Sequence, residues 1–150
     1  MRTLTRSALI AQPPAVVFAL VADVASYPHF VPGCSHAEIL MRGKDEVVAR
    51  LVVHRGPLST RLTTRNHLQP HEQIRMELVD GPLRALHGVW TFTPVASNGC
   101  RIELNLQFEF KSAFKAALLE PLLESTATAM VQAFVARAQA APRGAGHERT

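Results

Sequence analysis

Hydrophobic and polar residues alternate strictly along residues 101–110. In this stretch every even position is apolar and every odd position is polar. A period of two is typical of a β-strand with one face buried and the other in water. The same alternation continues through residues 35–110, where turn signals containing Gly, Pro, Asn or Asp separate the alternating runs. We therefore expect this part of the chain to form a series of antiparallel strands.

Parity divides the residues of these strands into two faces. Side chains two residues apart point to the same face of a sheet, so the apolar positions mark the interior. The positions expected inside are Val47, Ala49, Leu51, Val53, Leu58, Leu62, Thr64, Ile74, Met76, Leu78, Trp90 and Phe92. The positions of opposite parity, expected on the outer face, include Arg50, Arg61, Arg65, Arg75 and Arg101.

The pattern becomes helical on either side of this region. Residues 1–10 alternate and predict a first strand, after which Pro13-Pro14 begins an apolar helical stripe that Tyr27-Pro28 interrupts, giving two short helices. Residues 112–140 predict one long helix. Pro121 is expected to kink or divide it, because proline removes a backbone hydrogen bond and clashes with the preceding turn. Its apolar stripe is expected to comprise Phe114, Leu118, Leu122, Met130, Val131 and Phe134.

Together these elements predict an α+β helix-grip fold. A curved antiparallel sheet of six to seven strands would surround the long C-terminal helix, with two short helices after the first strand. One helix about 10 Å wide cannot cover six or seven strands spaced about 4.8 Å apart, so a wedge-shaped space remains for large side chains or a ligand. We expect one domain over residues 1–139 and a disordered tail over residues 140–150.

The composition argues against several classes of protein. The chain of 150 residues is 47% hydrophobic, somewhat more apolar than folding alone requires. It contains no run of 18 apolar residues that would span a membrane, and its start does not resemble a signal peptide. Cys34 and Cys100 form no disulfide or zinc motif, and His67 and His71 lack a third ligand, so no metal is expected. We expect a cytoplasmic protein.

Catalytic motifs give no support to an enzyme. The motifs of serine hydrolases, zinc proteases, P-loop proteins and dinucleotide-binding proteins do not occur. A polyketide cyclase-like enzyme would need an acid or base inside the cavity, whereas the inward positions are almost all apolar. Thr64 and Asn66 are the polar exceptions, and either would orient a ligand carbonyl or satisfy the backbone at a strand end. A non-enzymatic binding protein is favoured, with a cyclase-like enzyme as an alternative.

Five short segments occur in order along residues 3–138. They are Tyr27–Cys34, Thr63–Asn66, Leu78–Pro82, Gly88–Pro94 and Met130–Phe134 followed by Arg137-Ala138. Together they resemble the coenzyme Q-binding and ribosome association toxin family, a branch of the START-like lipid-transport superfamily. The resemblance implies a START-like fold and two roles reported for relatives, ubiquinone binding in support of respiration and binding of the large ribosomal subunit. Because mitochondrial relatives carry a presequence that this chain lacks, the resemblance implies a bacterial cytoplasmic member.

The apolar interior and the resemblance favour a carrier of a hydrophobic, lipid-like ligand. Ubiquinone is the expected ligand, with a role in respiratory electron transport, and no other cofactor is expected. The loop 27–34 and the helix around Pro121 are expected to form the mouth of the cavity. The predicted ligand-binding residues are Tyr27, Phe30, Leu51, Leu62, Thr64, Met76, Leu78, Trp90, Leu118 and Leu122.

The alternative function is a ribosome association toxin that binds the large ribosomal subunit and blocks subunit joining. Exposed arginine neutralises RNA phosphates without reading bases. The residues predicted to bind the ribosome are Arg50, Arg61, Arg65 and Arg75. Glu77, Glu103 and Glu109 dilute this charge, so an ordinary solvated sheet face is an equal alternative. A peripheral contact with the inner membrane is left open, and no DNA partner is expected.

Overall fold

Seven strands and three helices make up residues 1–140, the part of the chain that the computed structural model describes. The strands are β1 (Arg2–Ile10), β2 (Cys34–Arg42), β3 (Glu46–Arg55), β4 (Leu58–Gln69), β5 (Gln73–Asp80), β6 (Leu83–Val95) and β7 (Gly99–Phe110). The helices are α1 (Pro14–Ala22), the 3-10 helix η1 (Val24–His29) and α2 (Ala113–Ala140). The predicted order of elements is confirmed. Of the predicted tail, residues 141–150 lie outside the described residues, and Ala140 ends α2.

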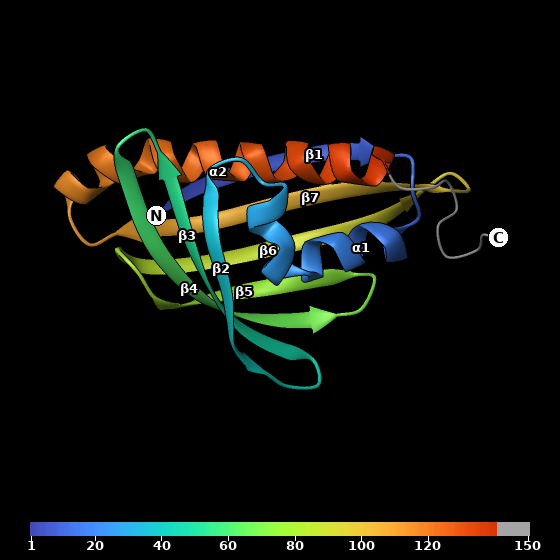
Figure 1. Ribbon diagram of the computed structural model, residues 1–150, viewed down its shortest axis with the longest axis horizontal. Helices are drawn as coiled ribbons and strands as arrows, with labels where there is room; N and C mark the ends of the chain where they lie inside the picture. The colour runs from blue at the N-terminus through green and yellow to red at the C-terminus, as the bar shows by residue number, and fades with distance from the viewer. Residues whose placement is uncertain (141–150) are drawn as a thin grey trace.

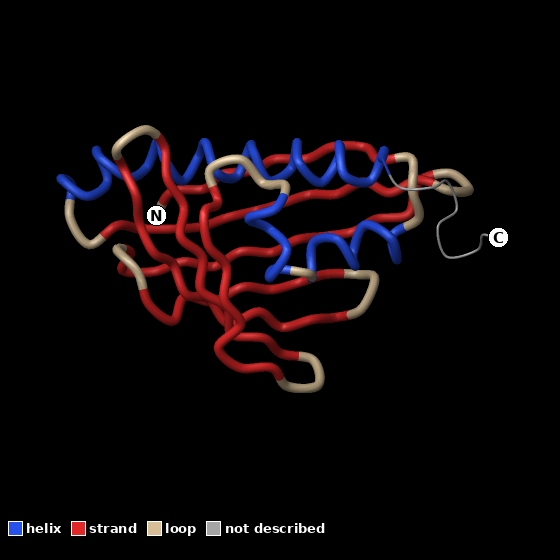
Figure 2. Tube along the Cα trace, viewed as in Figure 1, coloured by secondary structure: helices blue, strands red, loops and turns tan. Residues whose placement is uncertain are grey.

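The strands form one antiparallel sheet in the order β1-β7-β6-β5-β4-β3-β2. Each strand from β2 to β7 pairs with the next along the chain, and β1 pairs with β7. The sheet curves beneath α2, which runs along the length of the molecule (Figures 1 and 2). This is the predicted helix-grip arrangement with seven strands.

The predicted parity is clearest in β7. All of its even residues from Cys100 to Phe110 are buried, and none of its odd residues is. The register then places Leu104 opposite Trp90 on β6, and Ile102 opposite Phe92, so inward side chains meet across the strands. The burial of these side chains stabilises the sheet on its concave side.

Helix α2 runs from Ala113 to Ala140 without division at Pro121. Leu122, Val131 and Phe134 are buried, as the stripe predicted. Phe114 and Leu118 are not, since they are 73% and 41% exposed. The prediction that they face the core is wrong, because the start of α2 projects past the end of the sheet (Figure 1) and it is Leu119 and Leu122 that face strand residues in the following turns.

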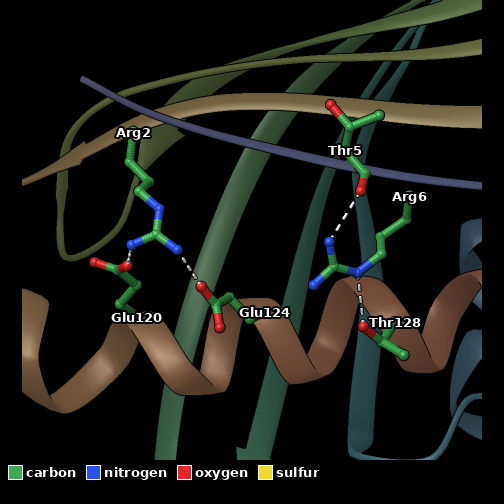
Figure 3. A network of polar contacts seen from close by, with 6 residues as sticks. All are labelled: Arg2, Thr5, Arg6, Glu120, Glu124 and Thr128. Atoms are coloured by element: carbon green, nitrogen blue, oxygen red, sulfur yellow. Dashed lines mark hydrogen bonds and ion pairs between the residues drawn. The ribbon is translucent and has the colours of Figure 1, made fainter.

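Two arginines of β1 connect this strand to α2 (Figure 3). Arg2 forms ion pairs with Glu120 and Glu124, and its Nη2 lies 2.6 Å from Glu124 Oε2. Arg6 donates from Nε to Thr128 Oγ1 at 2.9 Å. Because the partners on α2 are four residues apart, they share one face of the helix. These contacts fix the rotation of α2 over the sheet.

The two short helices close the other end of the fold. Val17, Phe18 and Val21 of α1 are buried, and the Phe18 ring packs edge-on against Phe92 with centroids 5.4 Å apart. In η1 the Tyr27 hydroxyl donates to the Val21 carbonyl, which joins the two helices.

Candidate functional site

An apolar cavity lies between the concave face of the sheet and α2. The space inside it that a water-sized sphere can occupy is about 90 Å³, which is smaller than the range of about 300 to 1,000 Å³ typical of ligand pockets. The lining residues come from α1, η1, strands β3 to β7 and α2. They are Val21, Val24, Tyr27, Ala49, Leu51, Val53, Leu62, Thr64, Asn66, Ile74, Met76, Leu86, Trp90, Leu104, Leu106, Leu123, Thr126, Ala127 and Met130.

A glycine in the middle of the sheet leaves room beside this cavity. Gly88 lies on β6 between the inward residues Leu86 and Trp90. A Cβ atom at this position would come within 2.6 Å of Met76 Cε and 2.7 Å of Leu106 Cδ2. The absence of a side chain at Gly88 therefore lets Met76 lie against the sheet instead of filling the cavity.

Aromatic rings form one wall of the cavity and the layer behind it. Phe134 is fully buried, and its ring centroid lies 5.4 Å from that of Trp90 and 5.5 Å from that of Tyr27. Phe30 packs behind this wall, 5.8 Å from Phe134, and the Arg137 guanidinium lies 4.8 Å from its ring centroid. This wall is packed side chain against side chain and is the closed side of the site.

Polar groups inside the cavity are few. Thr64 Oγ1 donates to Asn66 Oδ1 at 2.9 Å, and Asn66 is only 7% exposed. Thr126 contributes a hydroxyl from α2. Burial raises the pKa of Tyr27 far above its ordinary value, so its phenol stays protonated. None of the lining residues carries a side chain that titrates near neutral pH, so they offer no general acid or base for catalysis at neutral pH.

The structure brings most of the predicted ligand-binding residues together. Those that line the cavity are Tyr27, Leu51, Leu62, Thr64, Met76 and Trp90. Four others do not line it. Phe30 lies behind Phe134, Leu78 lies where β5 approaches its end, Leu118 is exposed, and Leu122 is buried against a neighbouring pocket. Whether the lining residues bind a ligand stays a prediction.

The segment 27–34, predicted to form the mouth of the cavity, packs against the core. The segment 27–34 holds the buried residues Tyr27, Val31 and Cys34, and Phe30 packs on Phe134. This segment is anchored to the core, and its opening as a mouth stays a prediction. Local pattern could not predict its ring contacts, because they come from a helix about 100 residues away in the chain.

Several lining residues were not predicted. Leu86, Leu104 and Leu106 had inward parity, but only the register shows that Leu104 lies opposite Trp90 and that Gly88 lies between Met76 and Leu106. Val21 and Val24 come from the short helices, and Leu123, Thr126, Ala127 and Met130 come from one face of α2. Helical period identifies that face, but not which part of it lies over the cavity.

A second, smaller apolar pocket adjoins the first. The space inside it that a water-sized sphere can occupy is about 20 Å³, and it shares Val53, Leu62 and Leu123 with the main cavity. The remaining lining residues are Thr60, Pro82, Leu83, Phe110, Leu119 and Leu122. Its lining comes from the residues beside the β3–β4 turn, the β5–β6 turn, the end of β7 and the first half of α2.

The outer face of the sheet carries mixed charge. Arg65 pairs with Glu46, and Arg50 lies 3.8 Å from Glu38 across the neighbouring strand. Arg61 and Arg75 are exposed, and neither forms an ion pair within residues 1–140. The predicted arginine set therefore splits into two paired and two unpaired residues.

A histidine adds to this mixed charge. His67 Nε2 lies 3.1 Å from Glu77 Oε1, and the hydrogen bond from His67 is the main cause that lowers the pKa of Glu77. Arg65 and Arg75 lower it further. The outer face thus carries neighbouring positive and negative side chains, with Arg61 and Arg75 among the unpaired positive ones.

The described residues give little support to thiol chemistry, metal binding or a membrane-spanning helix. Burial raises the pKa of the Cys34 and Cys100 thiols, and both cysteines are free. Nowhere in residues 1–140 do three or more His, Cys, Asp or Glu side chains gather so as to hold a metal ion. No helix in this part of the chain is long and apolar enough to cross a membrane.

A curved sheet that grips one helix and leaves an apolar cavity between them defines the helix-grip fold. Residues 10–135 match the family described as polyketide cyclase / dehydrase and lipid transport. The chain belongs to this family. The match covers most of the helix-grip elements, from the end of β1 into the second half of α2.

Two similar proteins belong to a particular branch of this family. Ribosome association toxin RatA of Pseudomonas aeruginosa is 42% identical over 134 residues, covering 89% of this chain and 93% of that protein. The mitochondrial coenzyme Q-binding protein COQ10 homolog B of Xenopus laevis is 32% identical over 122 residues, covering 79% of this chain and 50% of that protein. The predicted resemblance to the coenzyme Q-binding and ribosome association toxin family is confirmed.

A solved structure shows the same fold. The Zhui aromatase/cyclase from Streptomyces sp. R1128 has a TM-score of 0.86 with 23% identity, covering 97% of this chain and 98% of that one. At this identity the likeness concerns the fold and not the reaction.

Proposed function

We propose that this protein is a ribosome association toxin that binds the large ribosomal subunit and opposes subunit joining. The observation that carries the proposal is the 42% identity to RatA of Pseudomonas aeruginosa over nearly the full length of both chains. The likeness to the coenzyme Q-binding relative is lower and covers half of that protein. The ribosomal alternative thus has more support than the carrier that the sequence favoured.

The charge of the chain is consistent with an RNA partner. Its formal net charge is +4, and the unpaired guanidinium groups of Arg61 and Arg75 lie on the outer face of the sheet. Guanidinium groups that contact phosphates release counterions, so binding should weaken steeply as salt rises. Arg50 and Arg65 are less available, because carboxylates already neutralise them.

Cosedimentation with purified large subunits tests this proposal. We expect binding at low salt that the double variant Arg61→Glu/Arg75→Glu weakens at least tenfold. The matched control is Lys111→Glu/Lys115→Glu, which makes the same change in net charge at exposed positions beside the start of α2. If the wild type fails to sediment with subunits at low salt, the proposal is wrong. Equal losses in both double variants would show that only net charge matters.

A second candidate function is a non-enzymatic carrier of an apolar ligand. The observation that favours it is the cavity, whose lining is apolar apart from Tyr27, Thr64, Asn66 and Thr126. The named coenzyme Q-binding relative supports ubiquinone as the ligand, with a role in respiratory electron transport. The two functions use opposite faces of the sheet, so one protein can have both. Cyclase-like catalysis has less support, because the lining residues offer no acid or base.

Organic extraction tests the carrier. Protein purified from a quinone-producing host should release an isoprenoid quinone that mass spectrometry detects in near-stoichiometric amount. The control is the same protein with Leu62→Arg, which places a charge in the cavity wall and should abolish the signal. No lipid in the wild type, together with no binding of added ubiquinone, would contradict this function.

A further inference from the structure

A polar groove runs along the face of α2 that points away from the main cavity. The residues of α2 that line this groove are Pro121, Glu124, Ser125, Thr128, Ala129 and Gln132. At 3.6 residues per turn they lie on the side of the helix opposite Leu123, Ala127 and Met130, which face the cavity. The space that a water-sized sphere can occupy is about 430 Å³ in the groove, against about 90 Å³ in the cavity. A ligand can therefore enter the groove without moving the core.

Two arginines from distant strands flank the groove. Arg6 comes from β1 at one edge of the sheet, and Arg55 ends β3, one strand from the other edge. Neither guanidinium group pairs with a carboxylate within residues 1–140. Arg6 donates from Nε to Thr128 Oγ1 and from Nη1 to the Thr5 carbonyl (Figure 3), and its Nη2 has no partner in this range. The curved sheet thus brings two unneutralised positive charges to one groove.

The uncharged polar groups of the groove add hydrogen-bond donors. Because Thr128 Oγ1 accepts from Arg6, its hydroxyl proton is available to another acceptor. The Ser125 hydroxyl and the Gln132 amide also line the groove, and they form no hydrogen bond in the part of the chain that the structure describes. A negatively charged ligand with several acceptor oxygens matches this set of donors.

Glu124 is the one acidic residue among those that line the groove. Its Oε2 lies 2.6 Å from Arg2 Nη2, and Arg2 also pairs with Glu120 (Figure 3). The guanidinium groups of Arg2, Arg6 and Arg55 therefore outnumber the two carboxylates on this side of α2. The excess of one positive charge favours an anion over a cation.

The shape of the groove suits a chain better than a single anion. From Pro121 to Gln132 the helix rises about 16 Å, a length that one phosphate or carboxylate group does not fill. Ser125 and Ala129 lie in the middle of this span, and their small side chains let a ligand backbone lie close to the helix. An extended polyanion fits these dimensions.

We propose that this groove binds the phosphodiester backbone of RNA. Arg6 and Arg55 neutralise its phosphates, and the hydroxyls of Ser125 and Thr128 donate to the phosphate oxygens. These contacts read no bases, so they hold the RNA by its backbone alone. The inference rests on the ribosome association proposed above and adds a contact surface on α2.

A pair of substitutions at Ser125 tests the charge of the groove. Ser125→Glu places a carboxylate beside the two arginines, whereas Ser125→Gln has the size of glutamate and keeps a donor. In cosedimentation with large subunits at low salt, Ser125→Glu should weaken binding about tenfold and Ser125→Gln less than about threefold. Equal losses in the two variants would show that a larger side chain merely blocks the groove, and would contradict the binding of an anion.

Arg55→Glu gives a second test at an exposed position. It should weaken subunit binding about tenfold and lower the slope of log affinity against log salt by about 1, with an unchanged melting temperature. Arg42→Glu is the matched control, because Arg42 is exposed and unpaired among the described residues and lies at the end of β2. It should change binding less than about threefold. A loss in Arg42→Glu equal to that in Arg55→Glu would show that only net charge matters.

Two further probes identify the chemistry of the ligand. RNA extracted from the large subunit and freed of protein should bind in a filter assay and show the same order of variants. If Ser125→Glu weakens binding to intact subunits but not to this RNA, the groove contacts an acidic ribosomal protein and the assignment to RNA is wrong. Inorganic pyrophosphate should not bind below about 1 mM in calorimetry. If it binds more tightly while the extracted RNA does not bind, a small phosphate compound is the ligand instead.

The outcomes separate this inference from the function on which it rests. If the wild type does not sediment with large subunits, ribosome association fails and the groove fails as its contact surface. If the wild type sediments and both Ser125→Glu and Arg55→Glu sediment equally well, the groove is not part of the interface. The inference is then wrong, and ribosome association through the outer face of the sheet stands.

Discussion

The two faces of the sheet differ in what their side chains contact. On the concave face Trp90, Leu104 and Leu106 are nearly fully buried and pack around a cavity. On the outer face Arg65 and Arg50 balance Glu46 and Glu38 in water. Buried apolar area gives stability, whereas exposed ion pairs contribute only about 0 to 1 kcal/mol each. Changes on the concave face should therefore affect folding and ligand binding, and changes on the outer face should affect partners alone.

The largest effect is expected at Phe134, whose ring is fully buried against Tyr27, Phe30 and Trp90. Phe134→Ala should lower the free energy of unfolding by about 3 to 5 kcal/mol, because it leaves a cavity in the aromatic wall. Urea denaturation measures the change. Phe114→Ala is the matched control on the same helix, with an expected change within about 0.5 kcal/mol. Similar losses at both positions would contradict the division of α2 into an exposed start and a buried body.

A smaller effect is expected at Gly88. Gly88→Ala places a Cβ within 2.7 Å of Met76 and Leu106 atoms, so both side chains must move toward the cavity. We expect a loss of about 1 to 2 kcal/mol, in the lower part of the range for overpacking, because both atoms end flexible side chains. The loss should shrink in a Met76→Ala background, as a double-mutant cycle would show. Gly43→Ala, whose nearest contact would be 3.7 Å, is the control with almost no expected effect.

Alkaline pH should destabilise the fold through Tyr27. Burial raises the pKa of its phenol, and the ordinary value is 10.0. The unfolded chain therefore loses this proton first, so the contribution to stability is complete below pH 10 and declines above it. Between pH 10 and pH 11 the expected loss from this group is about 1 kcal/mol. Urea denaturation at both pH values should show a smaller decline in Tyr27→Phe, and an equal decline would indicate that other groups cause it.

The smallest effect is expected on the outer face. Arg61→Glu/Arg75→Glu should change the free energy of unfolding by less than about 0.5 kcal/mol, because both side chains are exposed and unpaired within the described residues. Thermal and urea denaturation measure it, beside the cosedimentation assay. A loss of more than about 1 kcal/mol in the free energy of unfolding would show that this face also supports the fold. A loss of ribosome binding in that variant would then be explained by lower stability as well as by lost charge.

Much of the fold could be predicted from the local pattern of apolar and polar residues. Period two predicted the strands and their inward positions, as in β7, and helical period predicted the span of α2, although not its continuity through Pro121. The family followed from short segments whose order along the chain was sufficient to identify it. These inferences succeed because backbone geometry alone dictates which neighbours in sequence share a face.

The candidate site depended on contacts between distant segments. Parity placed Leu62, Met76 and Trp90 inside, but it could not show that Phe30 lies behind Phe134 or that Leu122 belongs to a second pocket. It also placed Arg50 and Arg65 outside without showing that Glu38 and Glu46 neutralise them.

Sequence by itself determined the elements, the inward face of strands β3 to β7 and the family of this protein. Only the tertiary structure decided where the cavity lies, which residues enclose it and which arginines remain unpaired. The physical reason is that strand parity and helical period are local properties, whereas register and the placement of α2 arise from pairing between segments far apart in the chain. Phe114 and Leu118 illustrate this, because their helical period is regular and only the placement of α2 on the sheet leaves them exposed.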